Sequence, residues 1–332
     1  MDMEGDKRLE RLGEMAPLTA EEIDQILLEL REKKAEQKIE LQALPETPYQ
    51  PEKLEAIGQK IKEATNQIGE IFLYIRGNGK VPIEQITDVI VPTIEEAAEI
   101  PHLYFLFKEL YSKDEYTYRH TICVGVISAA IGRWIGLSPK ELKELTLAAV
   151  LHDIGKTRIP ESILQKPGKL TAEEFKEMKL HTVYGYELLR QIPGLPVTIP
   201  LTALQHHERE DGKGYPIGLK GFNTHLYSKI VAIADVFHAM SSDRIYHDAL
   251  PFYQIMKGMH DDMFGKFDPN IILIFLNHMM AGMVGNKVLL SNGMEGTMIM
   301  VNPYDPINSL VKVGNSIHDL SKEKGIGIER VY

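Results

Sequence analysis

Seven ionisable side chains on the apolar faces of successive predicted helices constrain the fold of this chain more than any other feature. Over residues 116–134 apolar side chains recur every three or four positions, which predicts a helix with His120 on its inward face. The helix expected over 138–156 has His152 and Asp153 at its buried end. The complete set is His120, His152, Asp153, His181, His206, His207 and Asp235. The fold must either bring these groups together at one site or give each of them its own polar partner.

The two middle helices of this series carry the later histidines. Phe175, Met178 and His181 are predicted to share one inward stripe of a third helix. Gly185, one turn further on, allows another helix to approach closely. His206 lies on the apolar face of a fourth predicted helix.

Metal ligation explains this set better than seven independent core contacts do. A lone inward histidine is usually a hydrogen-bonded core residue, and that alternative stays open for any one position. Burying five imidazoles and two carboxylates without compensation costs several kcal/mol per unpaired group, whereas two divalent cations compensate them all. Imidazole and carboxylate together favour iron or manganese, with nickel, zinc or cobalt as alternatives, over magnesium and calcium. Two metals bridged by a carboxylate are suited to in-line attack on phosphorus.

The remaining patterns predict a mainly α protein that ends in a small β appendage. Capping boxes mark helix starts at Thr19 with Glu22, Ser138 with Glu141, and Thr171 with Glu174. After residue 283 short alternating apolar runs replace the helical pattern, and Asn292-Gly293 is typical of a hairpin turn. We expect an N-terminal helical regulatory or dimerisation region over 1–112, a catalytic helical domain over 113–283 and a β-rich appendage over 284–332.

Charge and cysteine content narrow the class of protein further. The formal net charge of -10 argues against a surface for duplex nucleic acid, which needs clustered Lys and Arg. The single cysteine, Cys123, can form no intramolecular disulfide, which fits a reducing compartment. The longest apolar runs are interrupted by polar residues and fall short of the roughly 20 residues that span a bilayer. We expect a cytoplasmic protein without a membrane span.

Four stretches of the sequence carry a resemblance to a known family. They are "HDIGK" from His152, the lone His181, "HHEREDGKGYPIGLKG" from His206 and "IADVFHAMSSDRIY" from Ile233. Together they resemble the HD-GYP subgroup of the HD-domain phosphohydrolases over residues 113–282. The resemblance implies an HD-type helical bundle with a binuclear or trinuclear metal centre. It also implies hydrolysis of cyclic di-GMP to pGpG and on to GMP, through attack by a hydroxide that bridges the metals.

The resemblance assigns each of the seven groups to a metal. One ion is held by His120, His152, Asp153 and Asp235, and the other by Asp153, His181, His206 and His207, so that Asp153 bridges. Members with three metals have a glutamate where this chain has Tyr116, and two metals are therefore expected. His238 stands where the family often has an acid.

The resemblance also implies which residues meet the substrate. Lys156 stabilises the phosphate or the leaving oxygen. The loop with Gly214, Tyr215 and Pro216 forms the lip of the groove, where Tyr215 stacks on a guanine. Arg244 contacts a phosphate or a guanine edge. His247, in place of the family's basic residue, is the candidate for a second phosphate contact.

Structural alternatives remain for several of these positions. Lys156 can instead contact carbonyls at its helix end, and Gly212, Gly214 and Pro216 can merely shape a turn. Arg244 can instead pair with Asp243.

Two alternatives to cyclic di-GMP hydrolysis also remain. One is the same chemistry on mixed cyclic GMP-AMP, because no residue fixes the second base. The other is a non-catalytic cyclic-dinucleotide-binding or signalling module that docks a partner protein through the Gly-Tyr-Pro loop. A homodimer through the N-terminal helices is a further expectation.

Overall fold

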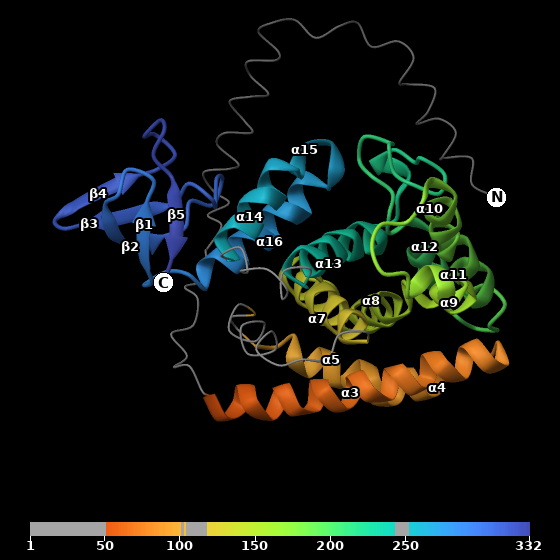
Figure 1. Ribbon diagram of the computed structural model, residues 1–332. Helices are drawn as coiled ribbons and strands as arrows, with labels where there is room; N and C mark the ends of the chain where they lie inside the picture. Colours follow the sequence, from red (N-terminus) through yellow and green to blue (C-terminus); the bar gives the residue numbers. More distant parts are fainter. Residues whose placement is uncertain (1–50, 101–102, 104–117, 243–251) are drawn as a thin grey trace, which may run out of the picture. The chain divides into compact units, whose positions relative to one another are not determined.

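A long helix and three short helical segments open the described part of the protein. The computed structural model describes residues 51–100, 103, 118–242 and 252–332, all within one unit, Pro48–Tyr332. The opening elements are α3 (Pro51–Asn78), α4 (Ile83–Gln85), the π-helical turn η2 (Ile86–Ile90) and α5 (Val91–Ala97). The break after α3 falls at Gly79, whose φ of 68° is favourable only for glycine. Helices α3 and α5 pack along α7 of the central bundle (Figure 1).

The central bundle contains all seven candidate ligands. Its elements are α7 (Arg119–Trp134), α8 (Pro139–Leu151), η3 (Ile154–Arg158), α9 (Glu161–Leu164), α10 (Ala172–Lys179), α11 (His181–Leu189), α12 (Thr198–Gln205), η4 (Gly221–Asn223), α13 (Leu226–Ser242), α14 (Phe252–Asp261), α15 (Met263–Lys266) and α16 (Pro269–Ala281). Helix α7 is the centre, packed against α8, α13 and α5. Its residues 121–132 are all buried, which explains its near-continuous apolar sequence. The predicted mainly α fold is confirmed.

The predicted helix starts are confirmed where the structure describes them. Ser138 caps α8 and Thr171 caps α10, each in a complete capping box with the glutamate three residues later. The third box, Thr19 with Glu22, lies outside the described residues.

The prediction that Phe175, Met178 and His181 share one inward helical stripe is wrong. Helix α10 ends at Lys179, and His181 begins the separate helix α11. Phe175 is 49% exposed, whereas His181 is only 1% exposed. The chain turns at Leu180, so the spacing of three no longer places these side chains on one face.

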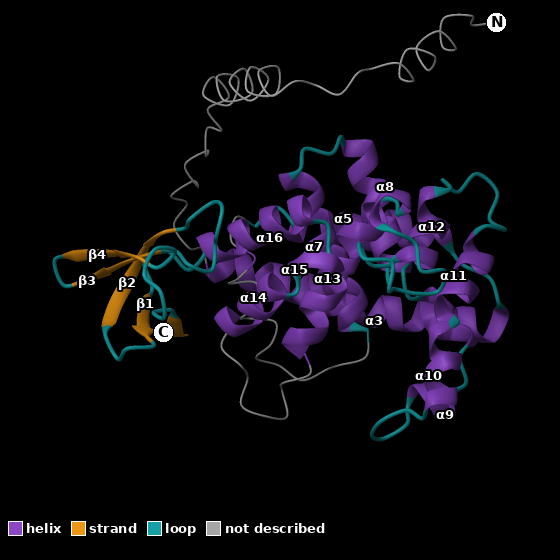
Figure 2. Ribbon diagram, turned by 90° about the horizontal axis from the view of Figure 1, so that it is seen from above, coloured by secondary structure: helices purple, strands orange, loops and turns teal. Residues whose placement is uncertain are grey.

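The C-terminal residues form one antiparallel sheet, as predicted (Figure 2). Its strands are β1 (Lys287–Leu290), β2 (Glu295–Met300), β3 (Leu310–Val313), β4 (Ser316–Asp319) and β5 (Ile328–Val331), in the order β4-β3-β2-β1-β5. The predicted turn at Asn292-Gly293 joins β1 to β2, and Gly293 takes the positive φ of 83° that this turn requires. Tyr253 of α14 donates to the carbonyl of Ile307, which ties the sheet region to the helices.

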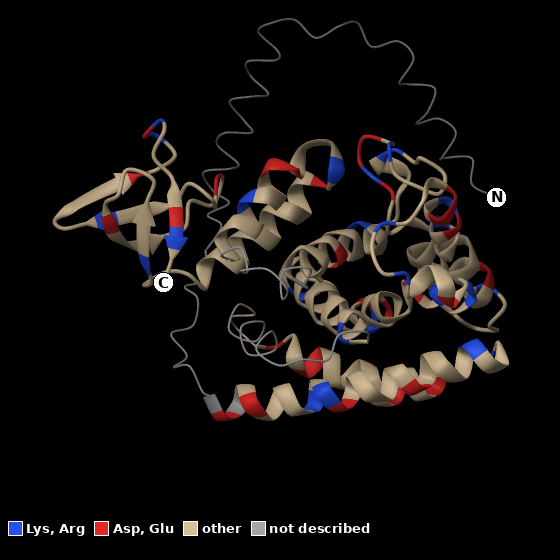
Figure 3. Cartoon of the chain, in the orientation of Figure 1, with Lys and Arg blue, Asp and Glu red and all other residues tan. Residues whose placement is uncertain are grey.

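Two surface properties bear on the expected partners. Figure 3 shows Lys and Arg interspersed with Asp and Glu along the described helices, rather than gathered on one of them. Among the described helices, none has both the length and the apolar content that crossing a membrane requires.

Candidate metal centre

Three of the candidate histidines sit where helices end, and their rings are fixed by the carbonyls of those ends. Nδ1 of His152 lies 2.7 Å from the carbonyl oxygen of Ala149, and Nδ1 of His181 lies 2.7 Å from that of Met178. Nδ1 of His206 lies 3.0 Å from the carbonyl of Ala203. A carbonyl can only accept, so each Nδ1 carries the proton and donates it to a carbonyl in the last turn of a helix. Each Nε2 is therefore left with a lone pair facing the centre.

The ligand atoms form two groups, which divide as the family resemblance implies. Within each group they lie within 4.8 Å of one another. The first group contains His120, His152 and Asp235, and the second contains Asp153, His181, His206 and His207. Nε2 of His120 is 3.2 Å from Oδ1 of Asp235.

Asp153 lies between the two groups. Its Oδ1 is 3.2 Å from Nε2 of His181 and 3.8 Å from Nε2 of His206. Its Oδ2 is 3.3 Å from Nε2 of His152 and 3.8 Å from Nε2 of His120. One carboxylate thus presents one oxygen to each group, which is the arrangement a bridging ligand needs.

The polar atoms of this centre fit a cation and are not satisfied without one. Nε2 of His152 and Oδ1 of Asp153 are buried and have no hydrogen-bond partner among the described residues. Nε2 of His181 and Nε2 of His206 are 3.3 Å apart, although both carry lone pairs when Nδ1 holds the proton. Buried lone pairs that face each other repel, and a divalent cation between them relieves this.

Burial keeps the second group of imidazoles neutral. It lowers the pKa of His207 to about 4 and that of His206 well below the usual 6.5, and nearby imidazoles lower the pKa of His206 further. The pKa of His181 is lowered as well, again mainly by burial. Burial alone would raise the pKa of Asp153, but Lys156 and His152 hold it well below its usual range. Neutral imidazoles around an ionised carboxylate are the protonation states in which these groups bind metal.

A glycine contact sets the distance between the elements that carry Asp153 and His181. A Cβ on Gly155 would clash with the backbone carbonyl of His181 and the backbone nitrogen of Gly185. Only glycine at this position lets η3 lie directly on α11. The close approach expected at Gly185 is therefore present, and the residue that approaches Gly185 is Gly155 of η3.

Lys156 contacts the carboxylate at the middle of the centre. Its Nζ donates to Oδ2 of Asp153. In this structure the ammonium therefore contacts a carboxylate, rather than the carbonyls at the helix end. The Lys156 side chain as a whole is 38% exposed.

The Gly-Tyr-Pro loop lies against the second group. The ring of Tyr215 stacks on that of His207, with centroids 4.6 Å apart and an angle of 28° between the planes. The Lys179 ammonium lies 5.3 Å from the centroid of Tyr215 and 4.8 Å from that of Phe175. Lys179 thus places a positive charge beside the Tyr215 ring. The sequence patterns do not single out this residue.

Glu208 belongs to the stretch that carries the family resemblance, although the sequence analysis assigns it no role, and it fixes the loop. Its carboxylate is 5% exposed and accepts backbone N–H bonds from Ile217, Gly218 and Leu219 at 2.8 to 3.1 Å. The N–H of Tyr215 donates to the carbonyl of His207 at 3.2 Å. Glu208 thus links the histidine pair to the loop that follows it.

Replacing Glu208 is expected to loosen this loop. In Glu208→Gln one of the two acceptor oxygens becomes a donor that faces backbone N–H groups, which should cost about 1–3 kcal/mol. We expect trypsin to cleave faster after Lys213 or Lys220, while the metal content is unchanged. Limited proteolysis checks this, with the exposed Glu173→Gln as the control. Equal cleavage rates in both variants would contradict the role of Glu208.

His238 contacts the candidate ligand His120 and is not itself one of the seven candidate ligands. It is 3% exposed, and its Nδ1 lies 2.9 Å from Nδ1 of His120. Burial and the nearby His120 lower the pKa of His238 to about 3, so the imidazole is neutral. One of these two Nδ1 atoms must carry the proton of the hydrogen bond between the rings. This hydrogen bond orients the ring of His120.

Besides Thr19 and Glu22, four positions named from the sequence lie outside the described residues. They are Tyr116, Asp243, Arg244 and His247. Their roles stay predictions.

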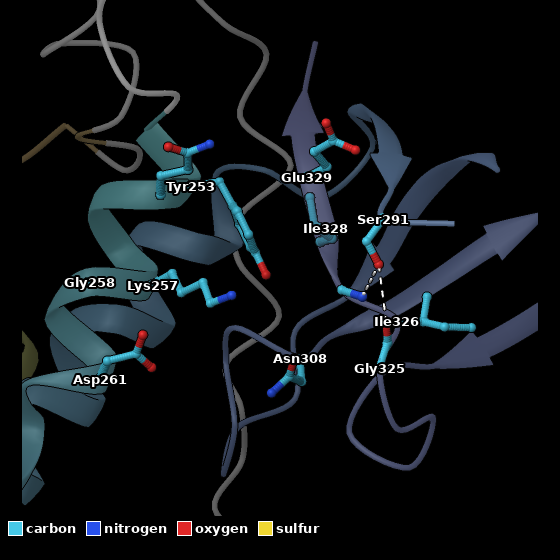
Figure 4. Close-up of a pocket in the computed structure, with 12 residues that line it drawn as sticks. Tyr253, Lys257, Gly258, Asp261, Ser291, Asn308, Gly325, Ile326, Ile328 and Glu329 are labelled. Carbon is cyan, nitrogen blue, oxygen red and sulfur yellow. Dashed lines mark hydrogen bonds between the residues drawn. The ribbon is translucent and has the colours of Figure 1, made fainter. Parts of the chain in front are cut away.

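A second hollow of the protein contains none of the candidate ligands. It has a volume of about 700 Å³ and lies between α14 and the end of the sheet that carries β5 (Figure 4). Lys257, Asp261 and Glu329 line it together with Tyr253 and Ile328. Its mixed charges favour no one ligand, in contrast to the histidine cluster.

Comparison with known proteins identifies the class of this centre. The sequence profile of the HD domain family matches residues 105–271, half of the chain. The chain belongs to the HD domain family, and the predicted resemblance to its HD-GYP subgroup is confirmed. Membership implies divalent-metal binding, and the histidine–aspartate cluster is the candidate site for it.

Three relatives are similar to this chain over 49% to 66% of its length. A cyclic di-GMP phosphodiesterase of Pseudomonas aeruginosa is 35% identical over 216 residues, which are 64% of this chain and 51% of that protein. A cyclic di-GMP phosphodiesterase of Thermotoga maritima is 42% identical over 49% of this chain and 45% of its own. A 3'3'-cGAMP-specific phosphodiesterase of Vibrio cholerae is 33% identical over 66% of this chain and 41% of its own. The chain thus spans about half the length of these relatives.

Proposed function

We propose that this protein is a metal-dependent phosphodiesterase that hydrolyses cyclic di-GMP to pGpG and GMP. The observation that carries the proposal is the position of Asp153, which presents one oxygen to each of two groups of imidazoles. Relatives named as cyclic di-GMP phosphodiesterases support the choice of substrate.

The proposed centre holds two divalent ions, iron or manganese first, with nickel, zinc or cobalt as alternatives. Its seven ligands are His120, His152, Asp153, His181, His206, His207 and Asp235. When bound, such ions activate water and neutralise phosphoryl oxygens. An imidazole-rich set of this kind disfavours magnesium.

The protein's own residues position the substrate in this proposal. Lys156 binds a phosphoryl oxygen near the scissile bond, and its contact with Asp153 supports this role. Tyr215 forms the lip and stacks on a base. Glu208 keeps that lip in place through the backbone of the loop.

The substrate is tested by comparing the two cyclic dinucleotides. The proposal predicts turnover of cyclic di-GMP with the linear dinucleotide as first product, measured by chromatography. The similarity to a 3'3'-cGAMP-specific enzyme makes mixed cyclic GMP-AMP the second candidate. A higher kcat/KM for the mixed dinucleotide would replace the proposed substrate, and binding without turnover of either would favour the non-catalytic module.

Removing the ring of Tyr215 is expected to weaken substrate binding. Tyr215→Ala should cost about 1–3 kcal/mol of binding free energy, the usual value of an aromatic stacking platform. Metal content should not change, because the ring is not a ligand. Tyr304→Ala, at an 83% exposed position, is the control. Unchanged affinity in Tyr215→Ala would leave the ring with no role beyond packing on His207.

Three expectations about partners and location remain part of the proposal. A homodimer through the N-terminal helices and a signalling partner at the Gly-Tyr-Pro loop are both predicted. A cytoplasmic location fits a cyclic-dinucleotide substrate. Size measurement of the purified chain tests the dimer.

A further inference from the structure

Arg76, in the last turn of α3, contacts a segment 80 residues away that adjoins the candidate metal centre. Its Nη2 donates to the carbonyl oxygen of Lys156 at 3.0 Å, and its Nη1 to that of Ile159 at 3.2 Å. A carboxylate oxygen of Glu161 lies 3.9 Å from Nη1. Arg76 lies outside the residues that match the HD domain profile.

The segment that Arg76 holds includes the short 3₁₀ helix η3 (Ile154–Arg158) and Ile159, which follows it. Such helices have poorer hydrogen-bond geometry than α-helices, and their last carbonyls have no partner inside the helix. Lys156 O accepts one bond from the N–H of Ile159 at 3.1 Å, and Arg76 supplies a second donor. The planar guanidinium bonds two carbonyls at once, which a single ammonium does less well.

Lys156 is thereby fixed at both of its ends. Its carbonyl is bonded by Arg76 of α3, and its ammonium is bonded to Asp153, which lies between the two ligand groups. Movement of the η3 backbone would move Lys156 and disturb its contact with Asp153. Helix α3 also packs on η3.

We propose that Arg76 is a positioning residue for Lys156 and Asp153, through which α3 controls the competence of the metal centre. The kinetic part of this inference rests on the proposed function. The structural part does not, because it concerns only the order of the η3 backbone.

A second polar contact of α3 provides a matched control. Nζ of Lys60 bonds both carboxylate oxygens of Glu96 at 2.7 Å on the exposed side of α3 and α5. Lys60→Met therefore removes a bond between α3 and its neighbour without touching η3. A role of Arg76 in docking α3 alone would be reproduced by this variant.

The test compares Arg76→Ala, Arg76→Lys and Lys60→Met in the full chain, with matched metal content. Hydrogen exchange of the amides of 154–159 should be about tenfold faster in Arg76→Ala, because bonds to that backbone are lost. We expect kcat for cyclic di-GMP to fall about tenfold with KM within about twofold, since Lys156 acts at the reacting phosphate. Arg76→Lys should restore only part of both effects, and Lys60→Met should show neither.

Three outcomes would overturn the inference. The first is unchanged exchange over 154–159 together with unchanged kcat in Arg76→Ala. The second is the same losses in Lys60→Met, which would reduce Arg76 to a docking contact. The third is full restoration by Arg76→Lys, which would make its charge the cause. Absence of turnover in the wild type would reject the proposed function, and the exchange rates would still decide the structural part.

Discussion

Asp153→Ala is expected to abolish hydrolysis in a protein that still folds. Asp153 presents an oxygen to each ligand group, so its loss would remove the bridge and the charge that the two proposed ions would share. Loss of an outer partner of a metal ligand costs about 10–100-fold. We therefore expect loss of the bridge itself to lower kcat by at least about 10³-fold, measured as product release from cyclic di-GMP.

The control separates this effect from general damage by an aspartate replacement. Asp262→Ala removes an exposed carboxylate that pairs only with Lys266 among the described residues, and it should retain turnover. Circular dichroism and gel filtration establish that Asp153→Ala is folded. Near-native turnover in a well-folded Asp153→Ala would contradict a mechanism that uses two ions.

Removal of bound metal is expected to abolish turnover and to lower the stability of the protein. Without ions, lone pairs of His181 and His206 face each other at 3.3 Å, and atoms of His152 and Asp153 lack partners. An ion at about 1,000 times its Kd adds about 4 kcal/mol to the free energy of unfolding. Chelation should therefore lower the Tm by several degrees and reduce turnover below detection.

Restoration of the metal provides the specific part of that experiment. Manganese or ferrous iron should restore both activity and Tm, whereas magnesium should not, because it prefers oxygen ligands. Asp153→Ala should gain much less Tm from added manganese. Full turnover after removal of the ions, verified by elemental analysis, would refute metal dependence.

The sequence predicted most of the set that the structure brings together. The apolar stripes and the spacing of His120, His152 and Asp153 place these groups in the bundle core, because periodicity determines which side of a helix is buried. The capping boxes at Ser138 and Thr171 are equally local signals, and both are confirmed.

The sequence predicted contacts between distant segments less well. Nothing near Leu180 marks the end of α10, since no glycine or proline separates Phe175 from His181, and the stripe prediction ran across the break. The bonds of Glu208 and Arg76 go to backbone groups, which have no residue-specific pattern to recognise. Such contacts depend on the path of the chain in space.

The number of metal ions bound per chain tests the central claim most directly. Seven ligands in two groups joined by Asp153 define two sites, so elemental analysis of active wild-type protein should give two transition-metal ions per chain. One ion, or three, in fully loaded and active protein would contradict the ligand assignment.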